Sequence, residues 1–504
     1  MAADLLMPLV FLSSLVFLLL GFLKKKKRLP LPPGPPTLPL IGHMHIMDQL
    51  THRGLARLAN KYGGIMYLRL GFMPTVVVSS PDAAKEVLKE QDGVFSNRPA
   101  TLTIRYLTYG LADMAFANYG PFWRQMRKLC VMKLFSRKRA ESWASVRHEI
   151  DGLIRTLAAG AGTTVNLGEL VFALTRNITF KAAFGSDFDD DQNVFLSILQ
   201  EFSKLFGAFN IGDFVPWLDR FDLQGLNKRL EKARGSLDRF TDRIIDDHMA
   251  KAKGKGEDGS DMVDELLAFL GDQASAGAED VLDENSAALK LTRENVKAIV
   301  MDVMFGGTET VASAIEWVMA ELMNNPKEME KVQDELKREV GLERQVEESD
   351  IERLVHLKRV FKETLRLHPP IPVLMHETAE ETELLGYRVP ARCRVMVNAY
   401  AIGRNPEAWP DANKFMPDRF ASEGAPDFKG SNFELIPFGS GRRSCPGMQL
   451  GLYTLELAVA RMVHSFTWAL PDGMKAGELD MSDTSGLTAP RAKQLEAVPT
   501  PRLL

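Results

Sequence analysis

The residues with the clearest chemical potential form a loop around a cysteine near the C-terminal end of the chain. Cys445 lies within residues 438–447, which read FGSGRRSCPG. A thiolate is a strong anionic metal ligand, and the glycines would let backbone N–H groups turn toward the sulfur, lowering the thiol pKa and tuning a bound metal. Arg442 and Arg443 would suit the anionic edge of a cofactor. The loop therefore indicates a metal ligand beside a site for acidic groups.

Three other interpretations of this loop fit less well. A phosphate-binding loop would need Lys directly after Gly441, and a dinucleotide fingerprint would need glycine where Ser444 stands. An inert buried thiol is the commonest state of a free cysteine. The rest of the loop favours metal ligation over that alternative.

The loop also carries a family resemblance, because residues 438–447 match the pattern F-x-x-G-x-R-x-C-x-G. This pattern resembles the haem-binding signature of the cytochrome P450 monooxygenases. The resemblance implies the mainly α cytochrome P450 fold with small β-sheets, and haem b bound through the thiolate of Cys445. It further implies that Phe438 and Arg443 contact the haem, the arginine at a propionate.

A long helix must position whatever faces this loop. Residues 292–323 are helical in pattern and apolar on most sides, and the run Asn324-Asn325-Pro326 stops the helix. Its length would be about 48 Å at about 1.5 Å per residue, enough to cross a domain. A helix that is apolar all round belongs in the interior. Short strand-like runs occur elsewhere, at residues 76–78 and 395–397.

The centre of this helix reads FGGTET, from residue 305 to residue 310. Two interior glycines cost about 1 kcal/mol each, and a buried carboxylate and hydroxyls need partners. One interpretation is a helix crossing, with the hydroxyls bonded back to the preceding turn. The other is a surface for a flat group, with a path for protons. The segment resembles the oxygen-activation motif of the cytochrome P450 family, which implies catalytic roles for Glu309 and Thr310 and places Gly306, often alanine there, beside the substrate.

Asp302 lies about one turn before Gly306 and shares its face. Two interpretations stay open, since this buried acid would either face the substrate or be neutralised by a basic residue elsewhere. By resemblance, the other walls of a substrate pocket come from a loop at residues 101–108, from Ile371 and Leu374, and from Leu487.

Glu363 and Arg366 are three residues apart on a predicted helix. On a surface such a pair would contribute only about a few tenths of a kcal/mol. The family resemblance instead implies a structural ion network with Arg419 on the haem-binding side, in which Asp418 stands where Glu is common.

Trp123 and Arg127 are four residues apart and share one helical face. They resemble the W-x-x-x-R element of the family, which implies contact with a haem propionate. His376 stands where the family often has a propionate-binding residue. The alternative for His376 is an ordinary loop histidine.

The N-terminus has the pattern of a membrane anchor. Residues 5–23 carry no charge and are long enough to span a bilayer, and residues 24–28 (KKKKR) follow directly. A cleaved signal peptide is the alternative, but the basic cluster follows the apolar stretch rather than preceding it. We expect an anchor at residues 1–23, a basic and Pro-rich hinge at 24–36, and a cytosolic catalytic domain at 37–504, attached to the endoplasmic reticulum membrane by a single span.

Composition excludes several other classes of protein. The net charge is −4, and no basic stripe suggests nucleic acid. The three cysteines, Cys130, Cys393 and Cys445, are too few and too scattered for a disulfide framework or a zinc site, which indicates a reducing environment. Residues 251–288 resemble a loose surface connector. Residues 202–217 are unusually apolar, as expected of core packing or of a lid that dips into a membrane surface.

Segments outside the haem signatures resemble one plant subfamily, the ferulate (coniferaldehyde) 5-hydroxylases. They are residues 301–317, 135–143 and 487–491. The resemblance implies O2-dependent hydroxylation of guaiacyl phenylpropanoids at ring position 5, in syringyl lignin synthesis. No flavin or NADPH fingerprint is present, so electrons would come from a separate membrane-bound NADPH–cytochrome P450 reductase. Its docking face would include the basic residues Arg124, Arg127, Lys128 and Lys138.

Three rival functions stay open on the sequence. One is a related plant monooxygenase acting on flavonoids or other phenolics. Another is a haem protein that binds gas or carries electrons, which the motif at residues 306–310 disfavours. The last is a membrane-tethered scaffold without a cofactor.

Overall fold

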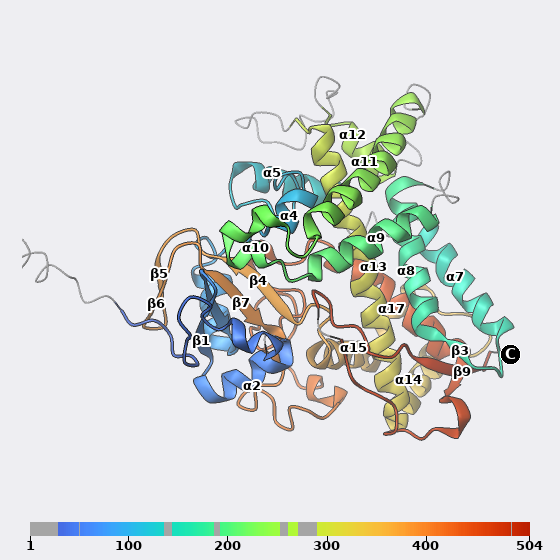
Figure 1. Ribbon diagram of the computed structural model, residues 1–504. Coiled ribbons are helices and arrows are strands. Elements are labelled where there is room, and N and C mark those ends of the chain that lie inside the picture. Colours follow the sequence, from blue (N-terminus) through green and yellow to red (C-terminus); the bar gives the residue numbers. More distant parts are fainter. Residues whose placement is uncertain are drawn as a thin grey trace, which may run out of the picture.

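The structure is a computed structural model that describes residues 29–49, 51–135, 144–185, 192–251, 261–270, 290–484 and 486–503. The expected anchor at 1–23, Lys138 and most of the connector at 251–288 lie outside these residues. The described part confirms a mainly helical fold with small sheets (Figure 1).

The helices are α2 His52–Tyr62, α3 Pro81–Lys85, α4 Leu102–Leu107, α5 Pro121–Lys133, α7 Ala144–Ala159, α8 Leu167–Phe184, α9 Gln192–Gly207, α10 Ile211–Phe214, α11 Leu226–Lys251, α12 Met262–Leu267, α13 Arg293–Asn324, α14 Pro326–Glu339, α15 Val355–Leu367, α16 Ala399–Ile402 and α17 Met448–Ser465. The strands are β1 Ile65–Leu70, β2 Met73–Val78, β3 Val165–Asn166, β4 Val373–Glu377, β5 Thr382–Leu384, β6 Tyr387–Val389, β7 Arg394–Asn398, β8 Phe466–Ala469 and β9 Glu496–Pro501.

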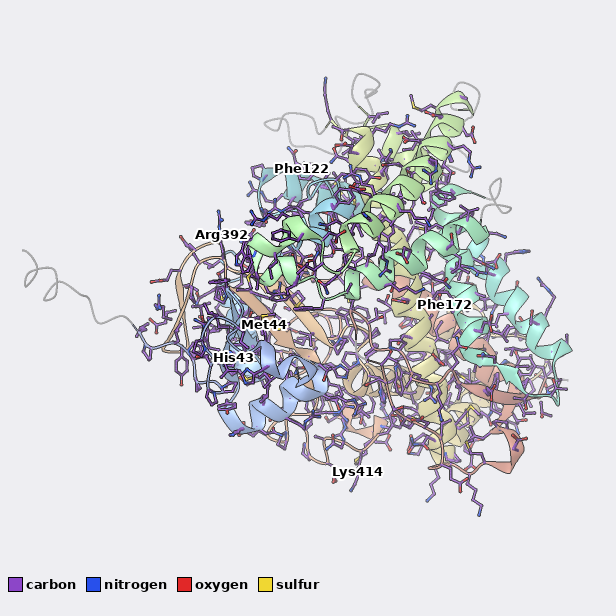
Figure 2. All side chains as sticks on the ribbon, viewed as in Figure 1. His43, Met44, Phe122, Phe172, Arg392 and Lys414 are labelled. Atoms are coloured by element: carbon purple, nitrogen blue, oxygen red, sulfur yellow. The ribbon has the colours of Figure 1, made fainter. Side chains whose placement is uncertain are left out.

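The long helix α13 runs through the middle of the helical region (Figure 1). Thr292 caps its start, accepting from the N–H of Asn295, and Pro326 opens the next helix. The predicted boundaries are thus confirmed. Within the described residues α13 is the one helix long and apolar enough to cross a membrane, but 61% of its most apolar window is buried inside the protein. Its apolar surface is explained by packing on α8, α15 and α17, and side chains fill the space around it (Figure 2).

The two predicted strand runs pair with each other, although they lie far apart in the chain. In the sheet β1-β2-β7-β4, Val76 lies opposite Val395 and Val78 opposite Val397, with β2 and β7 parallel. All four side chains are buried. This sheet carries β4 and so places His376 and Leu374 near the helical region.

The Pro-rich segment is extended, as its composition predicts, but it lies against the body of the protein. The N–H of Tyr67 donates to the carbonyl of Pro33 at 2.8 Å, and that of Arg388 donates to Pro30 at 2.8 Å. His43, labelled in Figure 2, contacts the carbonyl of Pro35 through Nε2 at 2.8 Å.

The apolar stretch at residues 202–217 was expected either to pack in the core or to form a lid at a membrane surface, and its residues are partly buried and partly exposed. Phe202 and Leu205 on α9 are buried in the core, whereas Trp217 is 61% exposed. Residues 101–108, expected as a pocket-lining loop, instead form α4 with its cap Thr101.

Candidate active site

A cavity of about 340 Å³ lies between α13 and the cysteine loop. Its other walls come from α5, α8, α17 and β4. The predicted site residues that line it are Cys445, Arg443, Phe438, Trp123, Arg127, His376, Asp302, Gly306, Thr310, Ile371 and Leu374. Glu309 and Leu487 are not among the lining residues.

Leu487 does not line the cavity and is 44% exposed, so its contact with a substrate stays a prediction. Residues 101–108, expected as a pocket wall, do not line the cavity either. Their helix instead packs against α9 and α11, and the N–H of Leu102 donates to Asp213 at 2.7 Å.

The glycines of the cysteine loop are required by its geometry. Gly441 has φ +67°, and a Cβ there would lie 2.0 Å from the carbonyl oxygen of Leu88. Only glycine adopts this conformation without strain and permits this approach. The N–H of Cys445 donates to the carbonyl of Phe438 at 2.8 Å, which closes the loop. Cys445 thus lines the cavity and is exposed there, although protein groups surround its thiol closely.

The pKa of Cys445 differs from the expectation. Burial raises the pKa of its thiol, while the N–H of Gly447 and the charge of Arg127 lower it by less. The expected lowering by the loop is present, but burial outweighs it because a thiolate loses its hydration in the interior. A metal bound at the sulfur would displace the proton outright.

Buried cations gather on one side of the cavity. Arg443 donates from Nε to the carbonyl of Ser96 at 2.7 Å, and Arg127 donates from Nη2 to the carbonyl of Ser444 at 2.7 Å. Burial and the neighbouring guanidinium of Arg98 lower the pKa of Arg443 to about 9. Burial lowers the pKa of Arg98 to about 10. Buried charges of one sign favour an anionic ligand beside them.

Arg98 is the residue that the sequence reasoning missed. It lines the cavity and donates to the carbonyl of Met375. A lone arginine before Pro99 matches no motif, so its only signal was a charge in an otherwise weakly charged segment.

His376 and Trp123 lie beside these arginines, but each already has a backbone partner. His376 Nδ1 contacts the carbonyl of Phe95 at 2.8 Å, and burial lowers the pKa of His376 to about 3, with Arg98 adding to the effect. The indole N–H of Trp123 donates to the carbonyl of Met114 at 2.9 Å, and the guanidinium of Arg443 lies 4.3 Å from the Trp123 ring. Their contact with a propionate stays a prediction.

The two central glycines of α13 do different things. A Cβ on Gly307 would lie 3.1 Å from Oγ1 of Thr179 on α8, so this glycine permits the helix crossing. A Cβ on Gly306 would meet nothing within 4 Å, because this position opens on the cavity. Gly307 thus fits the helix-crossing interpretation, whereas the surface for a flat group at Gly306 and the path for protons stay predictions.

The three polar residues that follow the glycines, Thr308, Glu309 and Thr310, also lie in different surroundings. Thr310 lines the cavity and donates to the carbonyl of Gly306 at 2.6 Å. Glu309 lies outside the lining, where its carboxylate accepts from Thr488 at 3.0 Å and from Ser203 at 3.3 Å. Thr308 is fully buried. The paired acid and alcohol of the motif thus face different surroundings.

Asp302 lines the cavity, and no basic residue among those described forms an ion pair with it. Its Oδ2 accepts the N–H of Met114 at 2.9 Å and that of Ala115 at 3.0 Å. Burial raises the pKa of Asp302 well above its ordinary value, and the neighbouring carboxyl of Asp113 adds to this. No direct ion pair with a described basic residue holds this acid, although the charge of Arg443 acts on it.

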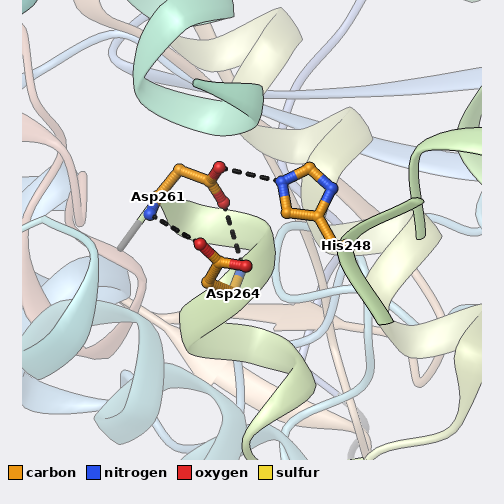
Figure 3. A group of neighbouring side chains, drawn as sticks. All are labelled: His248, Asp261 and Asp264. Atoms are coloured by element: carbon orange, nitrogen blue, oxygen red, sulfur yellow. Dashed lines mark hydrogen bonds and ion pairs between the residues drawn. The ribbon is translucent and has the colours of Figure 1, made fainter. Parts of the chain in front are cut away.

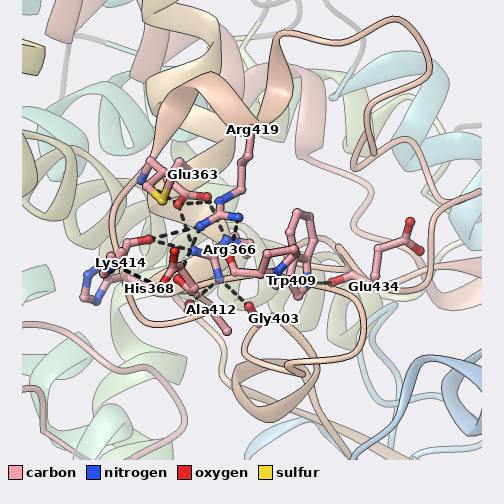
Figure 4. A network of polar contacts seen from close by, with 12 residues as sticks. Glu363, Arg366, His368, Gly403, Trp409, Ala412, Lys414, Arg419 and Glu434 are labelled. Carbon is pink, nitrogen blue, oxygen red and sulfur yellow. Dashed lines mark hydrogen bonds and ion pairs between the residues drawn. The ribbon is translucent and has the colours of Figure 1, made fainter.

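The predicted ion network is formed, and it is buried rather than superficial (Figure 4). Glu363 accepts from Arg366 at 2.7 and 2.8 Å and from Arg419 at 2.9 Å. Arg366 also donates to the carbonyls of Gly403 and Ala412. The network fastens α15 to the chain that leads into the cysteine loop.

A second group of potential metal ligands lies between α11 and α12 (Figure 3). His248, Asp261 and Asp264 place their ligand atoms within 4.8 Å of one another. His248 Nε2 contacts Asp261 at 2.8 Å, and Asp261 and Asp264 form a capping box. These contacts tie the two helices together.

Known proteins resemble this chain along nearly its whole length. The family description "Cytochrome P450" matches residues 32–496. The chain belongs to the cytochrome P450 family. It is 61% identical to cytochrome P450 84A1 of Arabidopsis thaliana over 98% of this chain and 96% of that protein. It is 54% identical to cytochrome P450 84A4 of the same plant, over 99% of this chain and 98% of that protein.

The fold agrees with this membership. A solved zebra fish cytochrome P450 structure with abiraterone has a TM-score of 0.74 and 26% identity, covering 90% of this chain and 99% of that one. The cytochrome P450 enzymes are monooxygenases that use O2, electrons from a reductase and organic substrates. Their cofactor is haem b, bound through a cysteine thiolate.

The residues of this cytochrome P450 fit that cofactor. Cys445 presents its sulfur to the cavity, the guanidiniums of Arg98, Arg127 and Arg443 lie buried at one side, and Gly306 leaves the α13 wall flat. An anionic macrocycle with an axial thiolate would satisfy the sulfur and offset the buried positive charge.

Proposed function

We propose that this cytochrome P450 hydroxylates the aromatic ring of guaiacyl phenylpropanoids at position 5. Coniferaldehyde, coniferyl alcohol and ferulate are the substrates, and the pathway leads to syringyl lignin. The observation that carries the proposal is that residues 301–317, which resemble the ferulate 5-hydroxylase subfamily, include the α13 wall of the cavity. Since residues 305–310 resemble a motif of the whole family, the subfamily resemblance at this wall comes from the other lining residues of α13, which are Asp302, Val303, Val311 and Ala314.

The roles of the residues follow from their positions. When bound, haem supplies the oxygen activation; Cys445 is its ligand, Phe438 packs beside it, and Arg98, Arg127, Arg443, Trp123 and His376 hold its acidic edge. Thr310 holds a water at the cavity wall, and Glu309 exchanges protons with it after turning from Thr488. Ile371 and Leu374 confine the ring. Glu363, Arg366 and Arg419 keep the cysteine loop in place.

A turnover assay with the reductase tests the substrate class. The three guaiacyl compounds and a panel of flavonoids are compared at equal concentration, and the products are analysed by mass spectrometry. We expect 5-hydroxylated guaiacyl products with the larger kcat/KM. Preferred turnover of a flavonoid would establish the alternative, a related plant monooxygenase of other phenolics. The ratio among the three guaiacyl compounds identifies the physiological substrate.

The enzyme is proposed to be anchored in the endoplasmic reticulum membrane through residues 1–23, with the hinge 24–36 and the catalytic domain 37–504 on the cytosolic side. An exposed apolar surface supports this, formed by Leu40, Phe72, Trp217, Phe221 and Leu223. The segments are adjacent, since the N–H of Phe72 donates to the carbonyl of Phe214 and that of Gly71 donates to Ile41. Such a patch suits contact with lipid. Removing residues 1–23 should release the protein from microsomes to the soluble fraction, and retention would show that the patch binds by itself.

NADPH–cytochrome P450 reductase is proposed to dock on the exposed face of α5. Arg124 and Lys128 are exposed and one turn apart. Arg127 lines the cavity instead, so we no longer count it among the docking residues. Lys128→Glu should slow turnover with the reductase but leave peroxide-driven turnover unchanged. Equal effects on both would reject this docking face.

A further inference from the structure

Two buried carboxyl groups meet at the wall of the active-site cavity. Asp302 on α13 lines the cavity, and Asp113, from the segment between α4 and α5, is 0% exposed. The two carboxyl groups lie close enough that the negative charge of Asp113 disfavours ionisation of Asp302.

The surrounding backbone orients both acids. Asp302 accepts the N–H groups of Met114 and Ala115 on Oδ2, and Asp113 accepts the N–H of Phe116 on Oδ2 at 3.0 Å. The nearby guanidinium of Arg443 donates instead to the carbonyls of Met114, Ala115 and Ala117. Among the described residues no cation forms a direct ion pair with either carboxyl, although the charge of Arg443 acts on both.

This arrangement offers the cavity an acceptor. Oδ2 of Asp302 is used by the two backbone N–H groups. The second oxygen of Asp302 keeps a lone pair for a ligand donor. A phenolic hydroxyl can donate to it, whereas an aryl methyl ether cannot.

Asp302 also lies close along α13 to Gly306 and Thr310, the residues proposed to lie nearest the oxidised carbon. Asp302 lies one helical turn, about 5.4 Å, before Gly306, which opens on the same cavity, and Thr310 follows one turn later. In a guaiacyl ring the 4-hydroxyl is bonded to the carbon next to position 5. A hydrogen bond at Asp302 would therefore place position 5 along α13 near Gly306.

We propose that Asp302, oriented by the amides of Met114 and Ala115, accepts a hydrogen bond from the phenolic hydroxyl of the substrate and so selects the ring carbon that is oxidised. Asp302 is a specificity residue in this proposal. The inference rests on the proposed function, since it requires a substrate with a free phenol.

The test measures binding rather than turnover. The haem-loaded enzyme is titrated with coniferaldehyde and with its 4-O-methyl ether, and the dissociation constants are read from the spin-state change of the haem spectrum. The wild type should bind the phenol roughly 10- to 100-fold more tightly, the size expected for a hydrogen bond to a charged or charge-sharing acid. In Asp302→Asn the amide oxygen accepts the two backbone N–H groups and the NH2 group replaces the acceptor, so the two affinities should become similar.

Asp472→Asn is the matched control, because Asp472 is exposed and lies outside the cavity lining; it should keep the preference for the phenol. Asp302→Ala, which removes the acceptor, gives the same comparison as Asp302→Asn if the latter does not incorporate haem. An unchanged preference in either Asp302 variant would overturn the assignment of Asp302 while leaving the proposed function intact. If the wild type binds neither compound, the proposed substrate class is wrong and the inference is overturned with it.

Discussion

The hydroxyl of Thr310 donates to the carbonyl of Gly306 at 2.6 Å, directly at the cavity wall. This bond uses the only hydrogen of the hydroxyl within the helix and leaves the oxygen as an acceptor toward the cavity. A water held there would lie in the same cavity as Cys445, which would hold the haem.

Thr310→Ala should therefore uncouple NADPH consumption from product. We expect product per NADPH to fall roughly 10-fold and hydrogen peroxide to rise, because a positioned proton source typically contributes about 10²-fold or more. The matched control is Thr308→Val, since Thr308 is fully buried and outside the cavity lining. Unchanged coupling in Thr310→Ala would remove this role.

Glu309→Gln tests the second half of the motif. The amide oxygen can still accept from Thr488, so the packing is retained while the ionisable proton is lost. We expect product formation to slow about 10- to 100-fold, with an increased solvent isotope effect. Thr488→Val, which removes only the partner, should keep most of the rate. A normal rate in Glu309→Gln would mean that protons reach the cavity by another route.

Gly441→Ala should prevent correct formation of the cysteine loop. An alanine in the left-handed conformation costs about 1–2 kcal/mol. The added Cβ would also collide with the carbonyl of Leu88, so the cysteine loop or the segment that carries Leu88 must shift. We expect at least a several-fold loss of the red-shifted Soret band of the reduced, carbon-monoxide-treated protein. Gly207→Ala, where nothing lies within 4 Å, should leave the band unchanged. A normal spectrum in Gly441→Ala would show that the loop tolerates the shift.

Glu363→Gln should destabilise the haem-binding side of the protein. It leaves the guanidiniums of Arg366 and Arg419 buried without a counter-charge, which typically costs about 3–5 kcal/mol. Asp418→Asn, which removes an acid from an exposed ion pair with Lys331, should cost at most about 1 kcal/mol. Denaturant unfolding followed by circular dichroism measures both. Similar midpoints for the two variants would contradict a dominant role for the buried network.

The pair of His248 and Asp261 should make stability depend on pH. Burial lowers the pKa of His248, but the hydrogen bond and charge of Asp261 outweigh this, so the pKa is raised above its ordinary value. The stabilisation is therefore complete below the ordinary histidine pKa and is lost as the pH rises through the higher folded value. His248→Gln should lower the melting temperature more at pH 6 than at pH 9. A loss of melting temperature that increases with pH would contradict the raised pKa of His248.

Much of the architecture could be predicted because its signals are local. The cap at Thr292 and the stop at Pro326 bound α13, and the valine runs of β2 and β7 form strands. The close spacing of Glu363 and Arg366 also predicted that they lie side by side. The glycines of the cysteine loop predicted its turns. Each of these features depends on residues within a few positions of one another, whose backbone preferences act without the rest of the fold.

The sequence by itself determined the family, the thiolate ligand and the helix that faces it. The tertiary structure alone decided the rest, including the positions of Arg98 and Asp113, the separate tasks of Gly306 and Gly307, the exposure of Leu487 and the raised pKa of Cys445. The physical reason is that burial and long-range contact set these properties. A titratable group takes its pKa from the groups packed around it, and those come from segments hundreds of residues apart.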